Sequence, residues 1–109
     1  MKAYNIIATG KVQDVGFRRS VQHKAWQFGV VGEVKNLADG SVMILAQGED
    51  ELLGEFIGSL SSIDPPVEVK KLVKAPTRVS KQRKNFKIKH GMLEEELEEG
   101  LGVVKNSLL

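Results

Sequence analysis

The dipeptide Asp39-Gly40 stands between two stretches of strand-like sequence and restricts how this chain can fold more than any other feature. Residues 41–47 place Val42, Ile44 and Ala46 at alternate positions, and residues 30–36 are rich in valine. Asp-Gly favours a tight hairpin because its residues readily adopt the positive φ angles of the turn. The middle of the chain is therefore predicted to be an antiparallel β-hairpin.

A helix is predicted on each side of this hairpin. In residues 18–28, Val21, Ala25 and Phe28 recur at i, i+4 and i+7, and Gly29 is a natural helix stop. After residue 48, acidic residues lie where the dipole of a new helix favours negative charge. An apolar stripe then follows, made of Leu52, Leu53, Phe56, Ile57 and Leu60.

Three further stretches have strand character: residues 2–9, residues 67–73, and a short segment that contains Phe86 and Ile88. The order of elements is that of an α+β, ferredoxin-like βαββαβ sandwich. This order predicts two helices packed on one face of an antiparallel sheet.

The chain of 109 residues is predicted to form one core domain over residues 1–90, followed by an acidic amphipathic helical extension over residues 91–109. The core region carries 15 basic and 9 acidic residues, whereas the extension carries five glutamates and one lysine. The extension is expected to leave the protein a monomer or to support a weak homodimer. Its predicted apolar stripe consists of Leu93, Leu97, Leu101, Val104 and Leu108.

The chain has no cysteine, which excludes disulfides and thiolate metal sites. No apolar run approaches the roughly 18 residues that a membrane-spanning helix needs, and the first residues do not resemble a signal peptide. We therefore expect a cytoplasmic protein without a membrane partner.

The loop between the first predicted strand and the first predicted helix is a candidate anion site. Gly10 and Gly16 bracket it, and Arg18 and Arg19 open the helix that follows. The first N–H groups of a helix have no internal partner, and together with the helix dipole and a guanidinium they can hold an anion. An ordinary strand-to-helix turn with solvated arginines is the alternative.

Three segments carry a resemblance to a known family. GKVQDVGFR (residues 10–18) closely resembles the G-x-V-Q-G-V-x-F-R signature of the acylphosphatase family. GEVKNLADGSV (residues 32–42) resembles the family's G-x-V-x-N-x-x-D-G-x-V, and NFKI (residues 85–88) resembles its closing strand. The resemblance extends over about residues 1 to 90.

This resemblance implies hydrolysis of a small-molecule acyl phosphate to a carboxylate and inorganic phosphate, without a metal or other cofactor. It also implies that Arg18 grips the phosphoryl oxygens and that Asn36 holds the attacking water. Arginine suits the first task because its planar fork matches two oxygens at once. The backbone cradle for the phosphate would be formed by Gln13, Asp14, Val15, Gly16 and Phe17.

Asp14 stands where the family has glycine. Aspartate tolerates left-handed backbone geometry, but its charge opposes a bound phosphate by roughly 3 kcal/mol at about 6 Å and an effective dielectric constant of about 20. We therefore expect activity that is retained but weakened. The alternative is a module with this fold that binds phosphate or another anion without catalysis.

A second alternative is nucleic-acid binding through the basic residues between positions 70 and 89. Phe86 is the sole aromatic residue in that stretch, and no stacking motif of an RNA-binding sheet is present. We therefore expect no nucleic-acid partner.

Overall fold

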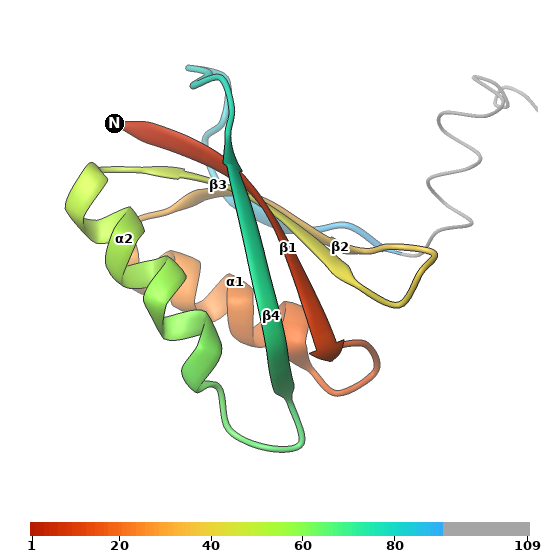
Figure 1. Cartoon of the computed structure of the whole chain (residues 1–109). Helices are drawn as coiled ribbons and strands as arrows, with labels where there is room; N and C mark the ends of the chain where they lie inside the picture. The colour runs from red at the N-terminus through yellow and green to blue at the C-terminus, as the bar shows by residue number, and fades with distance from the viewer. Residues whose placement is uncertain (91–109) are drawn as a thin grey trace, which may run out of the picture.

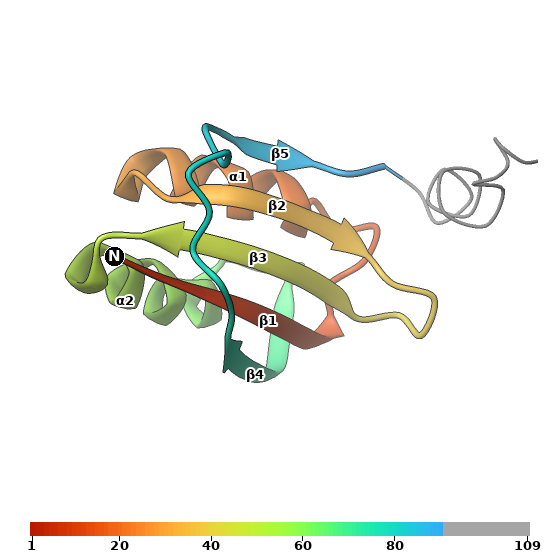
Figure 2. The same ribbon diagram turned by 90° about the horizontal axis from the view of Figure 1, so that it is seen from above.

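The computed structural model describes residues 1–90, which form one sheet with both helices on the same face (Figure 1, Figure 2). The elements are β1 (Lys2–Lys11), α1 (Phe17–Phe28), β2 (Val31–Asn36), β3 (Val42–Gly48), α2 (Asp50–Ser59), the short 3₁₀ helix η1 (Leu60–Ser62), β4 (Glu68–Pro76) and β5 (Phe86–Ile88). The predicted α+β ferredoxin-like sandwich is confirmed.

The five strands lie in the order β4-β1-β3-β2-β5. The first four pair antiparallel, but β5 pairs parallel to β2, with Phe86 opposite Gly32. The expectation of a wholly antiparallel sheet was therefore wrong. After β4, residues 77–85 cross from one edge of the sheet to the other, so β5 enters running in the same direction as β2 (Figure 2).

The core lies between the sheet and the helices. Ile6, Ile44 and Val34 are paired across the three central strands and are fully buried beneath the helices. From α1 the buried side chains are those of Phe17, Val21 and Ala25, and from α2 those of Leu53 and Phe56.

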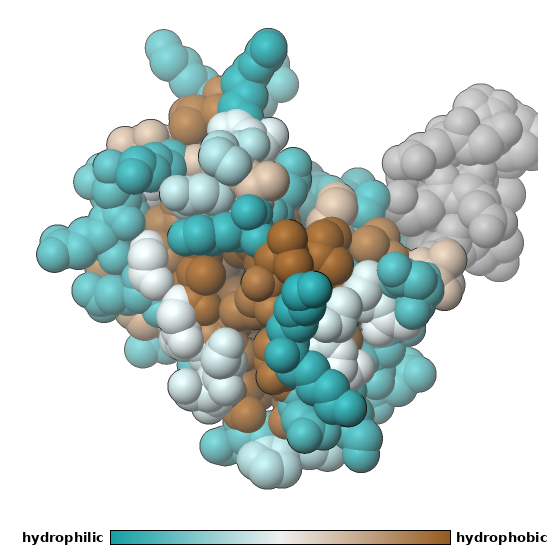
Figure 3. Space-filling view, in the orientation of Figure 1, coloured by the Kyte–Doolittle hydropathy of each residue, from teal (hydrophilic) through white to brown (hydrophobic). Residues whose placement is uncertain are grey.

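The predicted apolar stripes were right in part. Leu53, Phe56 and Leu60 are buried and Ile57 is half-buried, but Leu52 is exposed on the outer side of α2. Figure 3 shows apolar side chains gathered between α2 and β4 and beside the middle of β4, with hydrophilic residues around them.

Strand ends differ from the predictions by a few residues. β1 continues to Lys11 because its pairing with β4 resumes after a register shift between Thr9 and Gly10. β4 begins at Glu68 and continues to Pro76, where pairing with Tyr4 sustains it. Strand pairing thus extends both elements beyond their own sequence patterns.

Gly32 is required for the close pairing of β2 with β3. Its φ is 143°, and a Cβ atom added there would overlap the carbonyl oxygen of Leu45. Any larger residue at this position would push the strand that carries Asn36 away from its neighbour.

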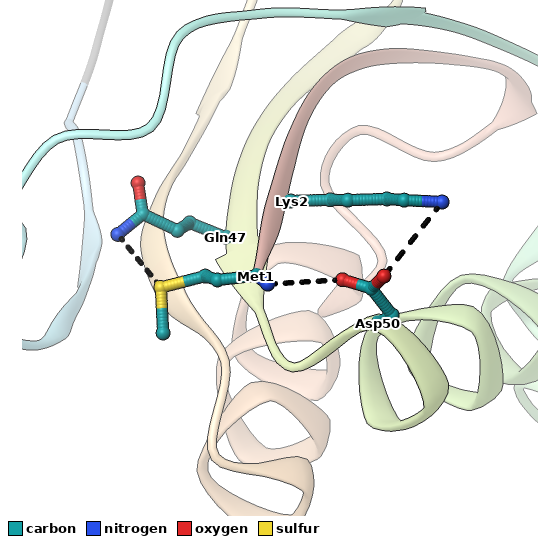
Figure 4. Close-up of polar contacts among 4 residues, drawn as sticks. All are labelled: Met1, Lys2, Gln47 and Asp50. Atoms are coloured by element: carbon teal, nitrogen blue, oxygen red, sulfur yellow. Dashed lines mark hydrogen bonds and ion pairs between the residues drawn. The ribbon is translucent and has the colours of Figure 1, made fainter.

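The amino terminus is fixed to the start of α2. The terminal amine of Met1 lies 3.1 Å from a carboxylate oxygen of Asp50, and the ammonium of Lys2 lies 3.9 Å from the other oxygen (Figure 4). The side-chain nitrogen of Gln47 also lies 3.7 Å from the sulfur of Met1. These contacts are at the end of the sheet opposite to the β1–α1 loop (Figure 1).

Neither helix in residues 1–90 is long and apolar enough to cross a bilayer. The predicted helical extension over residues 91–109 lies outside the described residues.

Candidate functional site

The loop between β1 and α1 is a left-handed turn held at both ends by buried side chains. Val12 and Phe17 are each 1% exposed and anchor the loop to the core. Between them, Asp14 and Gly16 have φ angles of 61° and 81°. Aspartate is one of the few residues that adopt this conformation readily, so the turn accommodates Asp14 in place of glycine.

The backbone N–H groups of this loop take no part in the hydrogen-bond network of residues 1–90 and are available to a ligand. Across residues 1–90, none of the N–H groups of residues 13–17 donates a hydrogen bond to another backbone group. Gly16 is the N-cap of α1, and no side chain caps that helix end. The positive end of the α1 dipole and several unpaired donors therefore meet at this loop.

A hollow of about 210 Å³ opens beside the loop. Among the predicted site residues, Asp14, Gly16, Phe17 and Arg18 line it. Two further residues with basic side chains, Arg19 and His90, line the hollow and were not among the predicted site residues. Both side chains are exposed.

Arg18 is held at the wall of this hollow by a carbonyl group. Its Nη1 atom donates a 2.9 Å hydrogen bond to the oxygen of Lys89, just beyond β5. The backbone N–H of Lys89 in turn donates to the oxygen of Val34 in β2. Arg18 is half-buried and forms no ion pair within residues 1–90, so its charge and its remaining donors are free for an anion.

Gln13 has a role that the sequence did not reveal. Its backbone had been predicted to join the cradle, but its side chain reaches the β2–β3 hairpin and donates 2.8 Å hydrogen bonds to the carbonyl oxygens of Leu37 and Ser41. The only signal in the sequence was the position of glutamine within the resembling motif. A long-range contact of this kind leaves no periodic pattern.

Asn36, the last residue of β2, lies in the same part of the molecule. Alternate side chains of a strand share a face, so Asn36 projects on the helix-bearing side, as does the buried Val34. Its side-chain oxygen is buried and has no hydrogen-bond partner within residues 1–90. An orphaned buried acceptor is uncommon, and it is typical of a site that binds water or a ligand.

The hairpin that follows Asn36 is stiffened by its own polar contacts. The carboxylate of Asp39 accepts hydrogen bonds from the hydroxyl and the backbone N–H of Ser41, over 2.5 Å and 2.9 Å. The hydrogen bond from the Ser41 hydroxyl, followed by that from its N–H, lowers the pKa of Asp39 below the ordinary 3.8. Ser41 is itself the acceptor for Gln13, so the hairpin and the loop share one network.

The predicted site residues thus fall into three groups. Asp14, Gly16, Phe17 and Arg18 meet in one hollow, while Val15 lines a second, larger groove on the other side of the loop together with Gly16. Gln13 and Asn36 line neither hollow. The side chain of Gln13 connects the loop to the hairpin, and Asn36 is the last residue of β2, next to the hairpin turn. Residues 1–90 contain no cluster of side chains suited to hold a metal ion.

Residues 1–90 form a small α+β sandwich in which the β1–α1 loop brings N–H groups without a backbone partner in this range to the N-terminus of α1. The acylphosphatase family model matches residues 4–88. An acylphosphatase of Clostridium acetobutylicum is 36% identical over 88 residues, which cover 81% of this chain and 97% of that protein. The chain belongs to the acylphosphatase family.

Solved structures agree with this assignment. The acylphosphatase of Bacillus subtilis superposes with a TM-score of 0.78 at 36% identity and covers 83% of this chain and 100% of its own. HypF from T. kodakarensis superposes with a TM-score of 0.74 at 33% identity, over 84% of this chain and 12% of its own. As an acylphosphatase, the chain hydrolyses the carboxyl–phosphate bond of acyl phosphates to a carboxylate and inorganic phosphate.

Proposed function

We propose that Arg18 and the amides of the β1–α1 loop bind the phosphoryl group for this hydrolysis, and that Asn36 directs the attacking water. An acyl phosphate already has a good leaving group. Its hydrolysis therefore requires positioning and charge compensation more than a strong nucleophile. The observation that carries the proposal is the guanidinium of Arg18, fixed by the oxygen of Lys89 in the same hollow as the unpaired loop donors.

The loop supplies fixed dipoles for the phosphoryl oxygens. In this role the N–H groups of Gln13, Asp14, Val15, Gly16 and Phe17 point to the anion, and Arg18 binds two of its oxygens with its remaining donors. Donors that are already in place need no reorganisation as charge develops in the transition state.

The side-chain oxygen of Asn36 has no partner among the described residues, which supports its assignment to the water. A carboxamide oxygen accepts a hydrogen bond from a water molecule and so aims the water's lone pair at phosphorus. The bond from water oxygen to phosphorus forms as the bond from phosphorus to the acyl oxygen breaks. The substrate's own phosphate takes the proton, so neither a metal nor another cofactor is required.

Turnover of benzoyl phosphate tests this assignment. We expect the wild-type chain to release phosphate, and both Arg18→Lys and Asn36→Ala to lose most of the rate while remaining folded. Full activity in both variants would refute the assignment of roles, and an inactive wild-type chain would refute the reaction itself.

The non-catalytic alternative is not favoured, because relatives that match most of the chain are acylphosphatases. That alternative predicts phosphate binding that Arg18→Ala abolishes, with no turnover of benzoyl phosphate by the wild-type chain.

Three finer expectations belong to the same proposal. The first is that residues 91–109 form a separate acidic helical extension of the 1–90 domain. The second is that the protein is a monomer or a weak homodimer through that extension. The third is that it acts in the cytoplasm on small molecules, without a nucleic-acid or membrane partner. Light scattering on the full-length chain and on a chain ending at residue 90 tests the second expectation.

A further inference from the structure

A groove of about 530 Å³ lies on the other side of the β1–α1 loop from the Arg18 hollow. One wall is the outer side of α1, with Ser20 and Lys24, and the other is the connection from η1 to β4. Figure 1 shows this connection and the β1–α1 loop at the same end of the molecule. We call this feature the α1 groove, and no role has been assigned to it above.

The α1 groove and the Arg18 hollow meet at Gly16, which lines both. Gly16 has no side chain, and the space that a Cβ atom would occupy there is open, so no side chain of residue 16 separates the two hollows. A ligand whose phosphoryl group is bound at the loop can therefore extend across Gly16 into the groove.

The direction of the groove suits the leaving group of the proposed reaction. In-line displacement places the leaving oxygen opposite the attacking water. Asn36 lies on β2, whereas the far wall of the groove leads into β4, and these two strands lie on opposite sides of β1 in the sheet. The acyl portion of the substrate would thus point away from Asn36 and towards the groove.

The groove carries one cation and one anion that do not neutralise each other. Lys24 is half-buried and Asp64 is exposed, both line the groove, and neither forms an ion pair within residues 1–90. Pro65 and Val67 add an apolar surface beside them. An acyl group with an aliphatic stem and a far end that bears both an ammonium and a carboxylate would complement these features.

We propose that the α1 groove binds the acyl portion of the substrate, and that Lys24 and Asp64 select acyl phosphates with a zwitterionic amino-acid head group. The side-chain acyl phosphates of acidic amino acids form this class. In such a substrate the α-carboxylate faces Lys24 and the α-ammonium faces Asp64. The inference rests on the proposed function, because it takes the phosphoryl group to be bound at Arg18.

Four acyl phosphates with matched chains test the proposal. β-Aspartyl phosphate has both head-group charges, succinyl phosphate lacks the ammonium, 3-aminopropanoyl phosphate lacks the carboxylate, and propanoyl phosphate lacks both. Solvent-exposed ion pairs typically change an equilibrium by up to about fivefold. We therefore expect kcat/KM for β-aspartyl phosphate to exceed that for propanoyl phosphate by roughly tenfold.

Single substitutions test which groove residue recognises which charge of the substrate. Lys24→Gln should remove the advantage of β-aspartyl over 3-aminopropanoyl phosphate, and Asp64→Asn should remove its advantage over succinyl phosphate. Lys81→Gln, which neutralises an exposed lysine outside the groove, should leave both ratios as in the wild-type chain.

Equal kcat/KM for all four substrates in the wild-type chain would overturn the groove assignment while leaving the proposed function intact. Ratios that neither groove variant changes would also overturn it. Arg18→Lys should lower the activity towards all four substrates, because it alters the phosphoryl site that they share. Absence of all four activities in the wild-type chain would instead refute the proposed function.

Discussion

The side-chain amide of Gln13 donates to the carbonyl oxygen of Leu37 over 2.8 Å, which joins the β1–α1 loop to the β2–β3 hairpin. The same nitrogen donates to Ser41, whose carbonyl also accepts the N–H of Leu37. Asn36 immediately precedes Leu37, so this contact fixes the spacing between the proposed phosphate cradle and the residue proposed to hold water.

Loss of this connection should affect both stability and activity. Gln13→Ala removes two hydrogen bonds to part-buried carbonyl groups, each of which keeps one backbone donor. At about 0.5–1.5 kcal/mol per hydrogen bond, this should lower the free energy of unfolding by about 1–3 kcal/mol. Gln13→Glu should be worse at neutral pH, because a carboxylate cannot donate to either carbonyl. Urea unfolding and kcat/KM for benzoyl phosphate measure the two effects.

Gln82→Ala, which alters an exposed glutamine in the segment between β4 and β5, is the matched control and should change neither quantity. Wild-type stability in Gln13→Ala would show that water replaces the amide without loss.

Arg18→Lys keeps the positive charge but removes the planar fork. Lysine cannot bind two phosphoryl oxygens and the oxygen of Lys89 with fixed geometry, so we expect kcat/KM for benzoyl phosphate to fall by about 10²–10³-fold. Arg19→Lys provides the comparison, because Arg19 lines the same hollow but is exposed, and it should change kcat/KM by less than about threefold. Equal losses in the two variants would indicate a general effect of arginine in this hollow.

The sequence predicted the elements of the fold because each has a local cause. Asp39-Gly40 favoured the hairpin, and the apolar spacing of residues 18–28 marked the first helix. The sequence did not predict the parallel pairing of β5. The local sequence of residues 77–85, which connect β4 to β5, does not indicate at which edge of the sheet the next strand will pair.

The candidate site was predictable in its residues but not in the contacts that position them. Resemblance indicated Arg18 and Asn36, but the contacts that fix their surroundings join residues distant in the chain. Arg18 and Lys89 are 71 positions apart, and Gln13 and Leu37 are 24 apart. Residue types and periodicity carry no information on such pairs, so the Gln13 side chain and the α1 groove emerged only from the structure.

Asp14→Asn tests the cost of the carboxylate in the loop. Asparagine also tolerates the φ of 61° found at this position, so the substitution changes charge with little change in backbone strain. The side chain is exposed, and screening by water should reduce the penalty to less than about 1 kcal/mol. We expect kcat/KM for benzoyl phosphate to rise about threefold at low salt.

The gain should disappear at about 1 M salt, where the screening length is about 3 Å. A gain that persists at high salt would mean that the substitution acts through the loop conformation instead. Asp14→Gly, measured alongside, should match Asp14→Asn if charge alone matters.

The hairpin network should make stability depend on acid pH. The hydroxyl and N–H of Ser41 lower the pKa of Asp39, so the folded state binds this proton less readily than the unfolded state. The stabilisation is therefore present above the unfolded pKa near 3.8 and is lost as pH falls through the lower folded value. Thermal unfolding of the wild-type chain and Asp39→Asn between about pH 2 and pH 6 measures this contribution. The difference in Tm should shrink at the acid end, and a constant difference would contradict the linkage.

Asn36→Ala should separate activity from stability. The side-chain oxygen of Asn36 is buried and has no hydrogen-bond partner among residues 1–90, and such a group typically costs the folded state about 1–3 kcal/mol. Removing it should leave the free energy of unfolding unchanged or higher, whereas kcat for benzoyl phosphate should fall about 100-fold because the water loses its acceptor. Urea unfolding and steady-state kinetics on one preparation give both values, with the exposed Asn5→Ala as a control that changes neither. A variant that loses stability along with activity would mean that Asn36 supports the hairpin, and the water would then need another partner.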